Sequence, residues 1–148
     1  MATRSNIAYK TAEGKIRSVY CHWDGYPAHN GEMLRRHYTD QAKIEALIEL
    51  GSLSSLRPEI GSKQDFDDRK SQNEDWCLAY HRDRGEELSI QEYEDIPEWI
   101  SEMEEYAYLW NGKEWLVNDH GEMRGGFPVF DFVSEKISAA DLKAVGWD

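Results

Sequence analysis

The chain has 148 residues, of which 40% are hydrophobic and 12% aromatic, with 29 acidic and 17 basic residues and a formal net charge of −12. This composition is typical of one folded domain, residues 1–148, and excludes a disordered acidic tail. The negative charge excludes general affinity for nucleic acid or anionic membranes, because both require clusters of cations. No run approaches the ~18 apolar residues of a membrane-spanning helix.

The N-terminal residues and the cysteine content predict a cytoplasmic protein. The stretch MATRSNIAYK has no apolar segment of signal-peptide length. Cys21 and Cys77 are the only cysteines, and in a reducing compartment such residues are usually small buried side chains rather than a disulfide.

Residues 4–10 and 15–23 predict an N-terminal β-hairpin, because side chains in a strand alternate between two faces. The more apolar face should cover a core, and it carries Val19, Cys21 and Trp23. The opposite face should be accessible, and it carries Tyr20, His22 and Asp24. The stretch YCHWDGY, residues 20–26, is therefore expected to be two-sided, with one side packed and one side free to bind.

Two short helices are expected after the hairpin. Residues 29–39 suit a helix with Asn30 as N-cap, and residues 40–51 suit a second helix with Asp40 as N-cap and Gly51 at its C-terminal end. The following residues 52–75 have no periodicity, so they predict a loop and an exposed polar excursion.

The second half alternates strands and helices. Residues 76–81 predict a short strand, and Pro97 begins a helix that includes Trp99, Ile100 and Met103. Residues 105–119 predict a hairpin with a type I′ turn at Asn111-Gly112. A last strand (127–133) and a C-terminal helix (138–145) complete an α+β domain with a mainly antiparallel sheet.

His22 and Asp24, two apart on one strand, leave three interpretations open. They could form a buried hydrogen-bonded pair, clamp a ligand, or act as a general base and its orienting carboxylate. Catalysis is the weakest of these, because no G-x-S-x-G nucleophile motif is present. Zinc binding is not expected either, since neighbours on a strand face opposite ways and no C-x2-C spacing occurs. We therefore predict no metal, no cofactor and more likely binding than enzymatic activity.

Arg82 and Arg84 would be same-side neighbours if the strand at 76–81 continued. Guanidinium groups suit phosphate or carboxylate ligands, although a solvated strand end is the simpler interpretation. A nucleotide-type site would combine such cations with aromatic faces, although aromatic strands more often form a core. The residues expected to contribute to it are Arg4, Tyr20, His22, Trp23, Asp24, Tyr26, Asn30, Arg82 and Arg84.

Residues 86–105 carry nine acidic residues and no Lys or Arg. Such a segment is usually a solvated surface, but it could also engage a basic protein. In that alternative the partner-binding residues are Glu92, Glu94, Asp95 and Glu98.

Five stretches of the chain, ATRSNIA, YCHWDGY, NGEMLRRHY, IEALIELGSLSSL and RDRGE, together resemble a family of small accessory proteins of tailed bacteriophages. The resemblance implies a protein made in the cytoplasm of an infected bacterium and directed at the host. Proteins of this kind often counter host defences, either by sequestering a nucleotide signal or by blocking a defence protein.

The leading hypothesis is therefore a non-catalytic anti-defence protein that sequesters a small nucleotide-type immune signal. An acidic inhibitor of a host defence protein or nucleic-acid-binding protein is the first alternative, and a small nucleotide hydrolase that uses His22 and Asp24 is the second. Sequestering proteins commonly build pockets between subunits, so a homo-oligomer is compatible with the leading hypothesis. Direct binding to nucleic acid or membrane is not expected.

Overall fold

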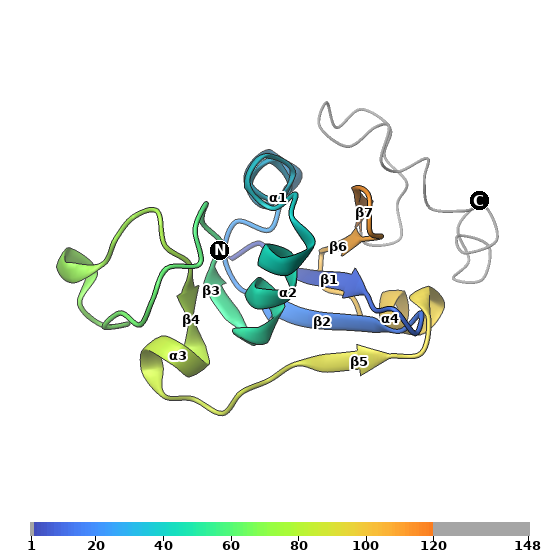
Figure 1. The fold of residues 1–148 in the computed structure, drawn as a ribbon. Helices are drawn as coiled ribbons and strands as arrows, with labels where there is room; N and C mark the ends of the chain where they lie inside the picture. Colours follow the sequence, from blue (N-terminus) through green and yellow to red (C-terminus); the bar gives the residue numbers. More distant parts are fainter. Residues whose placement is uncertain (1, 120–148) are drawn as a thin grey trace.

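The computed structural model describes residues 2–119, in which a seven-stranded sheet carries four short α-helices (Figure 1). The strands are β1 (Ser5–Lys10), β2 (Ile16–Cys21), β3 (Leu53–Ser55), β4 (Leu78–Ala79), β5 (Gln91–Tyr93), β6 (Tyr106–Trp110) and β7 (Trp115–Asp119). The helices are α1 (Glu32–His37), α2 (Gln41–Glu49), α3 (Tyr80–Arg84) and α4 (Ile96–Ser101), with a π-helical turn η1 (Pro27–Gly31) and a 3-10 turn η2 (Arg69–Ser71). The strand and helix expected at 127–133 and 138–145 lie outside the described residues.

The sheet is mixed, with the strand order β4-β3-β2-β1-β6-β7, and β5 pairs with the same edge of β2 that β3 uses further along. β1 and β2 form the predicted antiparallel hairpin, with Ile7 opposite Val19. β1–β6 and β2–β3 are parallel, and the remaining pairs are antiparallel. The predicted α+β class is confirmed. None of the described helices is long and apolar enough to cross a membrane.

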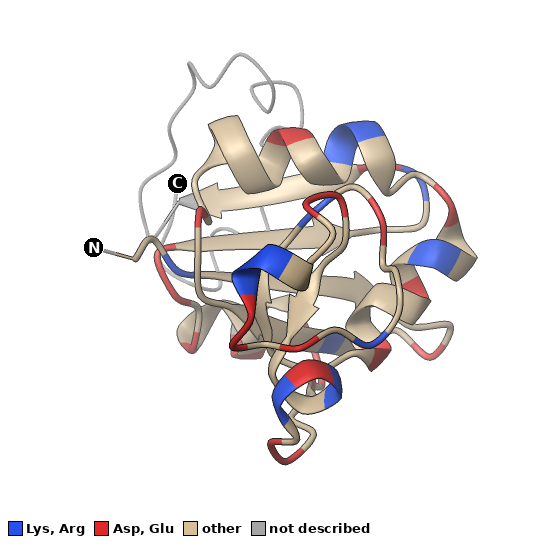
Figure 2. Ribbon diagram, turned by 90° about the vertical axis from the view of Figure 1, so that its left-hand side faces the viewer, with Lys and Arg blue, Asp and Glu red and all other residues tan. Residues whose placement is uncertain are grey.

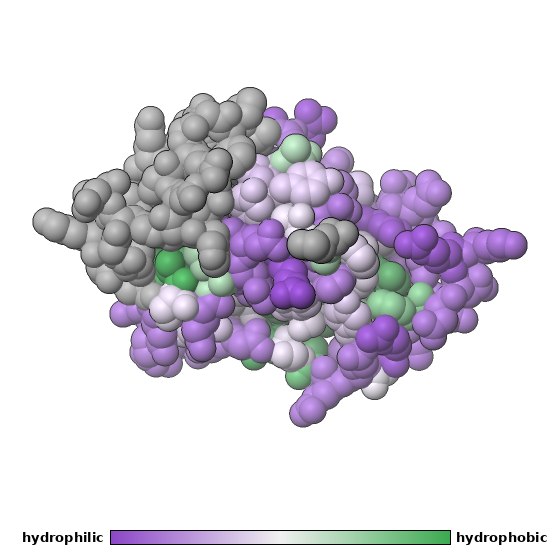
Figure 3. Space-filling model, turned by 180° about the vertical axis from the view of Figure 1, so that it is seen from behind, coloured by the Kyte–Doolittle hydropathy of each residue, from purple (hydrophilic) through white to green (hydrophobic). Residues whose placement is uncertain are grey.

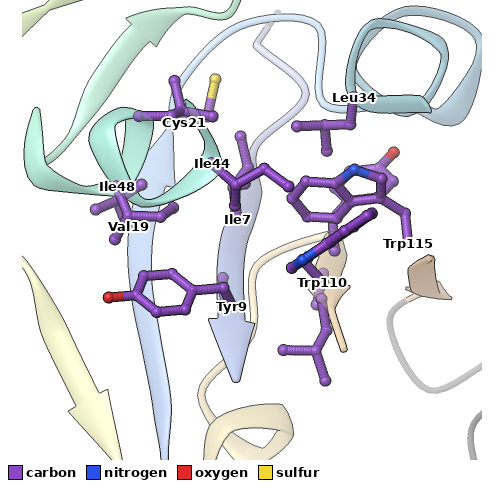
Figure 4. Close-up of a cluster of buried hydrophobic side chains, with 14 of the residues drawn as sticks. Ile7, Tyr9, Val19, Cys21, Leu34, Ile44, Ile48, Trp110 and Trp115 are labelled. Carbon is purple, nitrogen blue, oxygen red and sulfur yellow. The ribbon is translucent and has the colours of Figure 1, made fainter. Parts of the chain in front are cut away.

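The core lies between the sheet and the helices α1 and α2 (Figure 4). Alternate residues of β1 and β2 point toward these helices, as a two-residue period requires, and Ile44 and Ile48 come from one face of α2. Full burial of such a side chain contributes roughly 2 kcal/mol. The other face of the hairpin is covered as well, because the buried Trp99 of α4 donates from Nε1 to Ser18 Oγ at 2.9 Å.

The helix ends agree only in part with the sequence. Asp40 caps α2 as expected, accepting from the Lys43 amide at 3.0 Å, and Gly51 ends that segment with φ +79°. Asn30 is not an N-cap, because the chain is already helical from Pro27 and Asn30 lies inside η1. Pro27 begins that turn because the proline ring fixes φ at a value suited to a helix. The choice of Asn30 as N-cap did not take this early start into account.

The β6–β7 hairpin is confirmed, but its turn differs from the predicted one. Trp110 pairs with Trp115, so four residues form the loop. Only Gly112 of the Asn-Gly pair has positive φ, whereas a type I′ turn needs it at both positions. Asn111 instead accepts the amides of Lys113 and Glu114, each at 2.9 Å, on its side-chain oxygen.

The middle of the chain departs most from the predicted elements. The stretch 52–61 contains the strand β3, and the strand expected at 76–81 shortens to Leu78–Ala79 because α3 begins at Tyr80. Residues 62–75, called the excursion below, are largely exposed, as the sequence predicts. Trp99 and Ile100 are buried as expected, but α4 ends at Ser101, before Met103.

Candidate functional site

A cavity of about 390 Å³ lies between the end of the YCHWDGY stretch, strands β3 and β4, and the excursion. The residues that line it are Trp23, Asp24, Ser54, Ser55, Arg57, Phe66, Arg69, Gln72 and Leu78. A smaller hollow of about 210 Å³ is lined by three of these, Arg57, Arg69 and Gln72, together with Glu74. Figure 2 faces the side on which the excursion and α3 lie, and basic and acidic positions are interspersed along it.

Trp23 and Asp24 reach the cavity because β2 ends two residues earlier than the alternation suggests. The Trp23 amide donates to Ser54 O at 3.1 Å, which keeps this segment beside β3. Asp24 then has φ +56°, the only positive value for a non-glycine among residues 2–119. The expectation that Trp23 shares the core face with Val19 and Cys21 is therefore wrong: Trp23 is 43% exposed, because the turn rotates it out of the strand pattern.

Gly25 anchors this turn from behind. Its amide donates to Thr3 O at 2.8 Å, and its carbonyl accepts from the Tyr108 hydroxyl at 2.6 Å. A Cβ at this position would lie only 2.8 Å from Thr3 O, so only glycine allows the approach. The left-handed Asp24 is thus held in place by its neighbour, a type of local strain that clusters at functional sites.

The opposite wall is the excursion, which side chains hold in place. Gln72 donates from Nε2 to the carbonyls of Asp65 (2.9 Å) and Phe66 (3.0 Å). The Arg84 guanidinium lies 4.5 Å from the centre of the Phe66 ring. Contacts within the protein therefore hold both the backbone and the ring of Phe66, which lines the cavity.

Arg57 is positioned through its backbone. Its carbonyl accepts from the Tyr38 hydroxyl at 2.6 Å, and its amide donates to Cys77 Sγ at 3.3 Å. Burial raises the pKa of both Tyr38 and Cys77, so both groups remain protonated at neutral pH. Among residues 2–119, the guanidinium itself makes only a long hydrogen bond, 3.4 Å, to Asn73 O.

The two arginines that line the cavity form no ion pair with the described residues. Within the described part of the chain, neither Arg57 nor Arg69 lies within ion-pair distance of a carboxylate. Guanidinium groups in that condition can bind a phosphate or carboxylate bidentately. The cavity therefore combines two aromatic rings, the Asp24 carboxylate and two cations that have no ion-pair partner in the described part of the chain.

Of the nine residues predicted for ligand binding, Trp23 and Asp24 line the cavity. The others are outside its lining: Arg4, Tyr20, His22, Tyr26, Asn30, Arg82 and Arg84. Arg4 is exposed, and its amide bonds to Glu105 Oε1 at 3.3 Å. The buried Asn30 donates from Nδ2 to Ser5 Oγ and Trp23 O, both at 3.3 Å, so its amide stitches the turn to β1.

His22 and Asp24 do not form the pair that the sequence allows. The Tyr20 hydroxyl and His22 Nδ1 are 2.6 Å apart, which agrees with their predicted common face. Asp24 Oδ1 instead accepts from the Tyr26 hydroxyl at 3.3 Å, and this carboxylate raises the pKa of Tyr26. The left-handed turn at Asp24 separates the two groups that a strand would have placed side by side.

Arg82 belongs to the fold, because the strand on which it was expected is the helix α3. Its guanidinium donates to Asp83 at 2.9 Å and 3.1 Å, to Ile60 O at 2.8 Å and to Cys77 O at 2.7 Å. Asp83 is buried and also accepts the amides of Gln64 and Ala79, each at 2.8 Å. This network fastens the excursion to β4. Arg84 pairs with Glu86 and stacks on the Phe66 ring.

Sequence patterns do not identify the cavity-lining residues between 54 and 72, because a segment without periodicity predicts only a loop. The isolated Phe66 within a polar stretch, flanked by Arg57 and Arg69, was the signal that could have found them. Large aromatic side chains seldom occur in an excursion without a packing or binding partner.

The acidic segment 86–105 is partly neutralised within the molecule. Glu92 lies 3.8 Å from both Lys15 Nζ and Arg17 Nη1, and Glu94 lies 3.6 Å from Lys15 Nζ. Asp95 caps α4 by accepting the Glu98 amide at 2.9 Å, and Glu98 accepts the Glu94 amide at 2.8 Å. Seen from behind, the described surface is mostly hydrophilic, with small separate hydrophobic patches (Figure 3).

No protein-family model, curated protein or solved structure matches the chain. Within residues 2–119, no three His, Cys, Asp or Glu side chains are grouped to hold a metal ion.

Proposed function

We propose that the protein binds a small nucleotide-type ligand in the cavity between Trp23 and the excursion. The observation that carries this proposal is that one hollow combines two aromatic rings with two cations that have no carboxylate partner within residues 2–119. Its volume of about 390 Å³ is within the range of small-molecule sites, ~300–1,000 Å³.

Each part of the ligand has a counterpart in the lining. Arg57 and Arg69 would neutralise a phosphate, and the exposed ring of Trp23 would stack on a base. Asp24, a carboxylate that can only accept hydrogen bonds, would receive them from ribose hydroxyls or from base N–H groups.

Binding without turnover is favoured over hydrolysis. The hydrolase hypothesis needs His22 and Asp24 in one site, whereas Asp24 lines the cavity and His22 bonds to Tyr20 outside it. The resemblance to phage accessory proteins then supplies the setting: a protein of the infected bacterial cytoplasm that holds a nucleotide immune signal of the host. A homo-oligomer remains part of this proposal only if two copies share the cavity.

The test is a thermal-shift screen of the purified protein against nucleotides, including mononucleotides, cyclic dinucleotides and cyclic ADP-ribose isomers. A ligand at 100 times its Kd adds about 2.7 kcal/mol to the free energy of unfolding. That corresponds to roughly 5–10 °C in a domain of this size. The double variant Arg57→Gln/Arg69→Gln should lose the shift.

Arg36→Gln is the matched control, because Arg36 is exposed and pairs with Glu32 on α1, outside the cavity lining. It should keep the full shift. A flat panel with the wild-type protein would contradict the proposal and favour a protein partner for the acidic segment. Mass spectrometry of the recovered ligand checks that it is unaltered.

A further inference from the structure

The cavity continues into a second hollow, and the two share their charged wall. Arg57, Arg69 and Gln72 line both, whereas Trp23, Asp24 and Phe66 line only the larger one and Glu74 only the smaller one. The arginines therefore lie between a partly aromatic compartment and a polar one.

A phosphate bound by these arginines would be flanked by space on both sides. If it were a terminal phosphate, nothing of the ligand would enter the smaller hollow, and its second negative charge would lie near Glu74. Glu74 is exposed, and within residues 2–119 it has no ion-pair partner that would neutralise it. Like charges that share one hollow repel each other, which disfavours binding.

A phosphodiester lessens this repulsion and extends the ligand into the smaller hollow. It carries one negative charge rather than two, and its second ester oxygen leads into the smaller hollow. There the Glu74 carboxylate can accept hydrogen bonds from the hydroxyl or amino groups of a second nucleoside. The side-chain N–H groups of Gln72 already donate to the carbonyls of Asp65 and Phe66, so its amide oxygen is the side-chain atom that remains available to a ligand, as an acceptor.

We propose that the ligand is a dinucleotide whose linking phosphodiester is bound by Arg57 and Arg69. One nucleoside occupies the compartment of Trp23 and Phe66, and the other extends toward Glu74. This inference rests on the proposed nucleotide-binding function and narrows it to ligands with an internal phosphate.

The experiment measures the affinities of matched probes by isothermal titration calorimetry. The dinucleoside monophosphates ApA and GpG are compared with AMP and GMP, using the wild-type protein, Glu74→Gln, and Glu59→Gln as control. Glu59 is likewise exposed, pairs with Lys43 and lines neither hollow.

We expect one dinucleoside monophosphate to bind at least about tenfold more tightly than its mononucleotide, the factor that one or two hydrogen bonds to a charged group supply. Glu74→Gln should weaken the dinucleotide severalfold while leaving the mononucleotide unchanged or tighter, and Glu59→Gln should change neither.

Two results overturn the inference in different ways. Mononucleotides that bind as tightly as dinucleotides, or a Glu74→Gln effect equal on both, would leave nucleotide binding intact and refute the internal phosphate. If neither these four probes nor any nucleotide of the thermal-shift screen binds the folded wild-type protein, the proposed function fails, and the inference fails with it.

Discussion

The arginines of α3 and those of the cavity differ in how far protein atoms occupy their hydrogen-bond donors, although Arg84 lies against Phe66, which lines the cavity. Arg82 makes four hydrogen bonds to protein atoms, and its side chain is 16% exposed. Among residues 2–119, the Arg57 guanidinium makes one long hydrogen bond, and Arg69 is exposed. A guanidinium can serve a ligand only where the fold has left its donors free, and the donors of Arg82 are already occupied.

The largest expected effect separates Arg82 from its neighbour Arg84. Arg82→Ala should lower the free energy of unfolding by about 3–5 kcal/mol, because it leaves the buried Asp83 carboxylate without its cation. Arg84→Ala should cost less than about 1 kcal/mol, since the Arg84 side chain is 43% exposed and its ion pair with Glu86 is at the surface.

Urea unfolding followed by circular dichroism measures both values. Similar values for the two variants would contradict the distinction between a structural and a surface arginine. Arg82→Ala is therefore not a suitable test of binding, because loss of affinity in an unfolded variant says nothing about contact with a ligand.

The second prediction concerns how stability depends on pH, and it involves Cys77, which contacts both Arg82 and Arg57. The carbonyl of Cys77 accepts from Arg82, and its sulfur bonds to the backbone of Arg57. Burial raises the pKa of Cys77 and raises that of Cys21 from 9.0 to about 12. Above about pH 9 the unfolded chain loses thiol protons that the folded protein keeps, so the free energy of unfolding should fall by ~1.4 kcal/mol per pH unit for each such thiol.

Urea unfolding between pH 8 and 10.5 tests this slope. Stability should be constant with respect to these thiols below about pH 8, where both states are protonated. Cys21→Ala should make this decline less steep by up to ~1.4 kcal/mol per pH unit, the slope that one thiol contributes, whatever the substitution does to packing. A wild-type protein with no decline in this window would show that the thiols titrate alike in both states.

Local patterns predicted the parts of the fold that local physics determines. The alternation in β2 identified Val19 and Cys21 as core residues, and the Asp40 cap and the glycine at 51 followed from helix-end preferences. The alternating pattern wrongly predicts a core position for Trp23, because Trp23 lies beyond the end of β2. The Asp24-Gly25 pair, a turn signal, was the information that should have limited it.

The cavity could not be predicted in full, because distant contacts position its far wall. Buried Asp83 binds the Gln64 amide, and Gln64 in turn accepts from the Asn73 amide at 2.7 Å. No repeating pattern in 57–72 encodes these contacts. The helix α3 was also missed, although Gly85, with φ +75°, is the residue type that typically ends a helix.

The smallest expected effect tests whether α3 acts on the cavity indirectly. Arg84 lies over the Phe66 ring, and Phe66 lines the cavity, so Arg84→Ala should let that ring move without removing any group that touches the ligand. A cation–π contact at an exposed site is worth about 0.5–1 kcal/mol, which corresponds to a roughly two- to fivefold loss of affinity. Calorimetry with the ligand that emerges from the screen measures this loss of affinity.

Two further variants serve as controls. Arg84→Lys should restore part of the lost affinity, and Phe66→Ala should cause a larger loss than Arg84→Ala. If Arg84→Ala weakens binding more than Phe66→Ala does, then Arg84 contacts the ligand itself, and the separation between the arginines of α3 and those of the cavity fails at this residue.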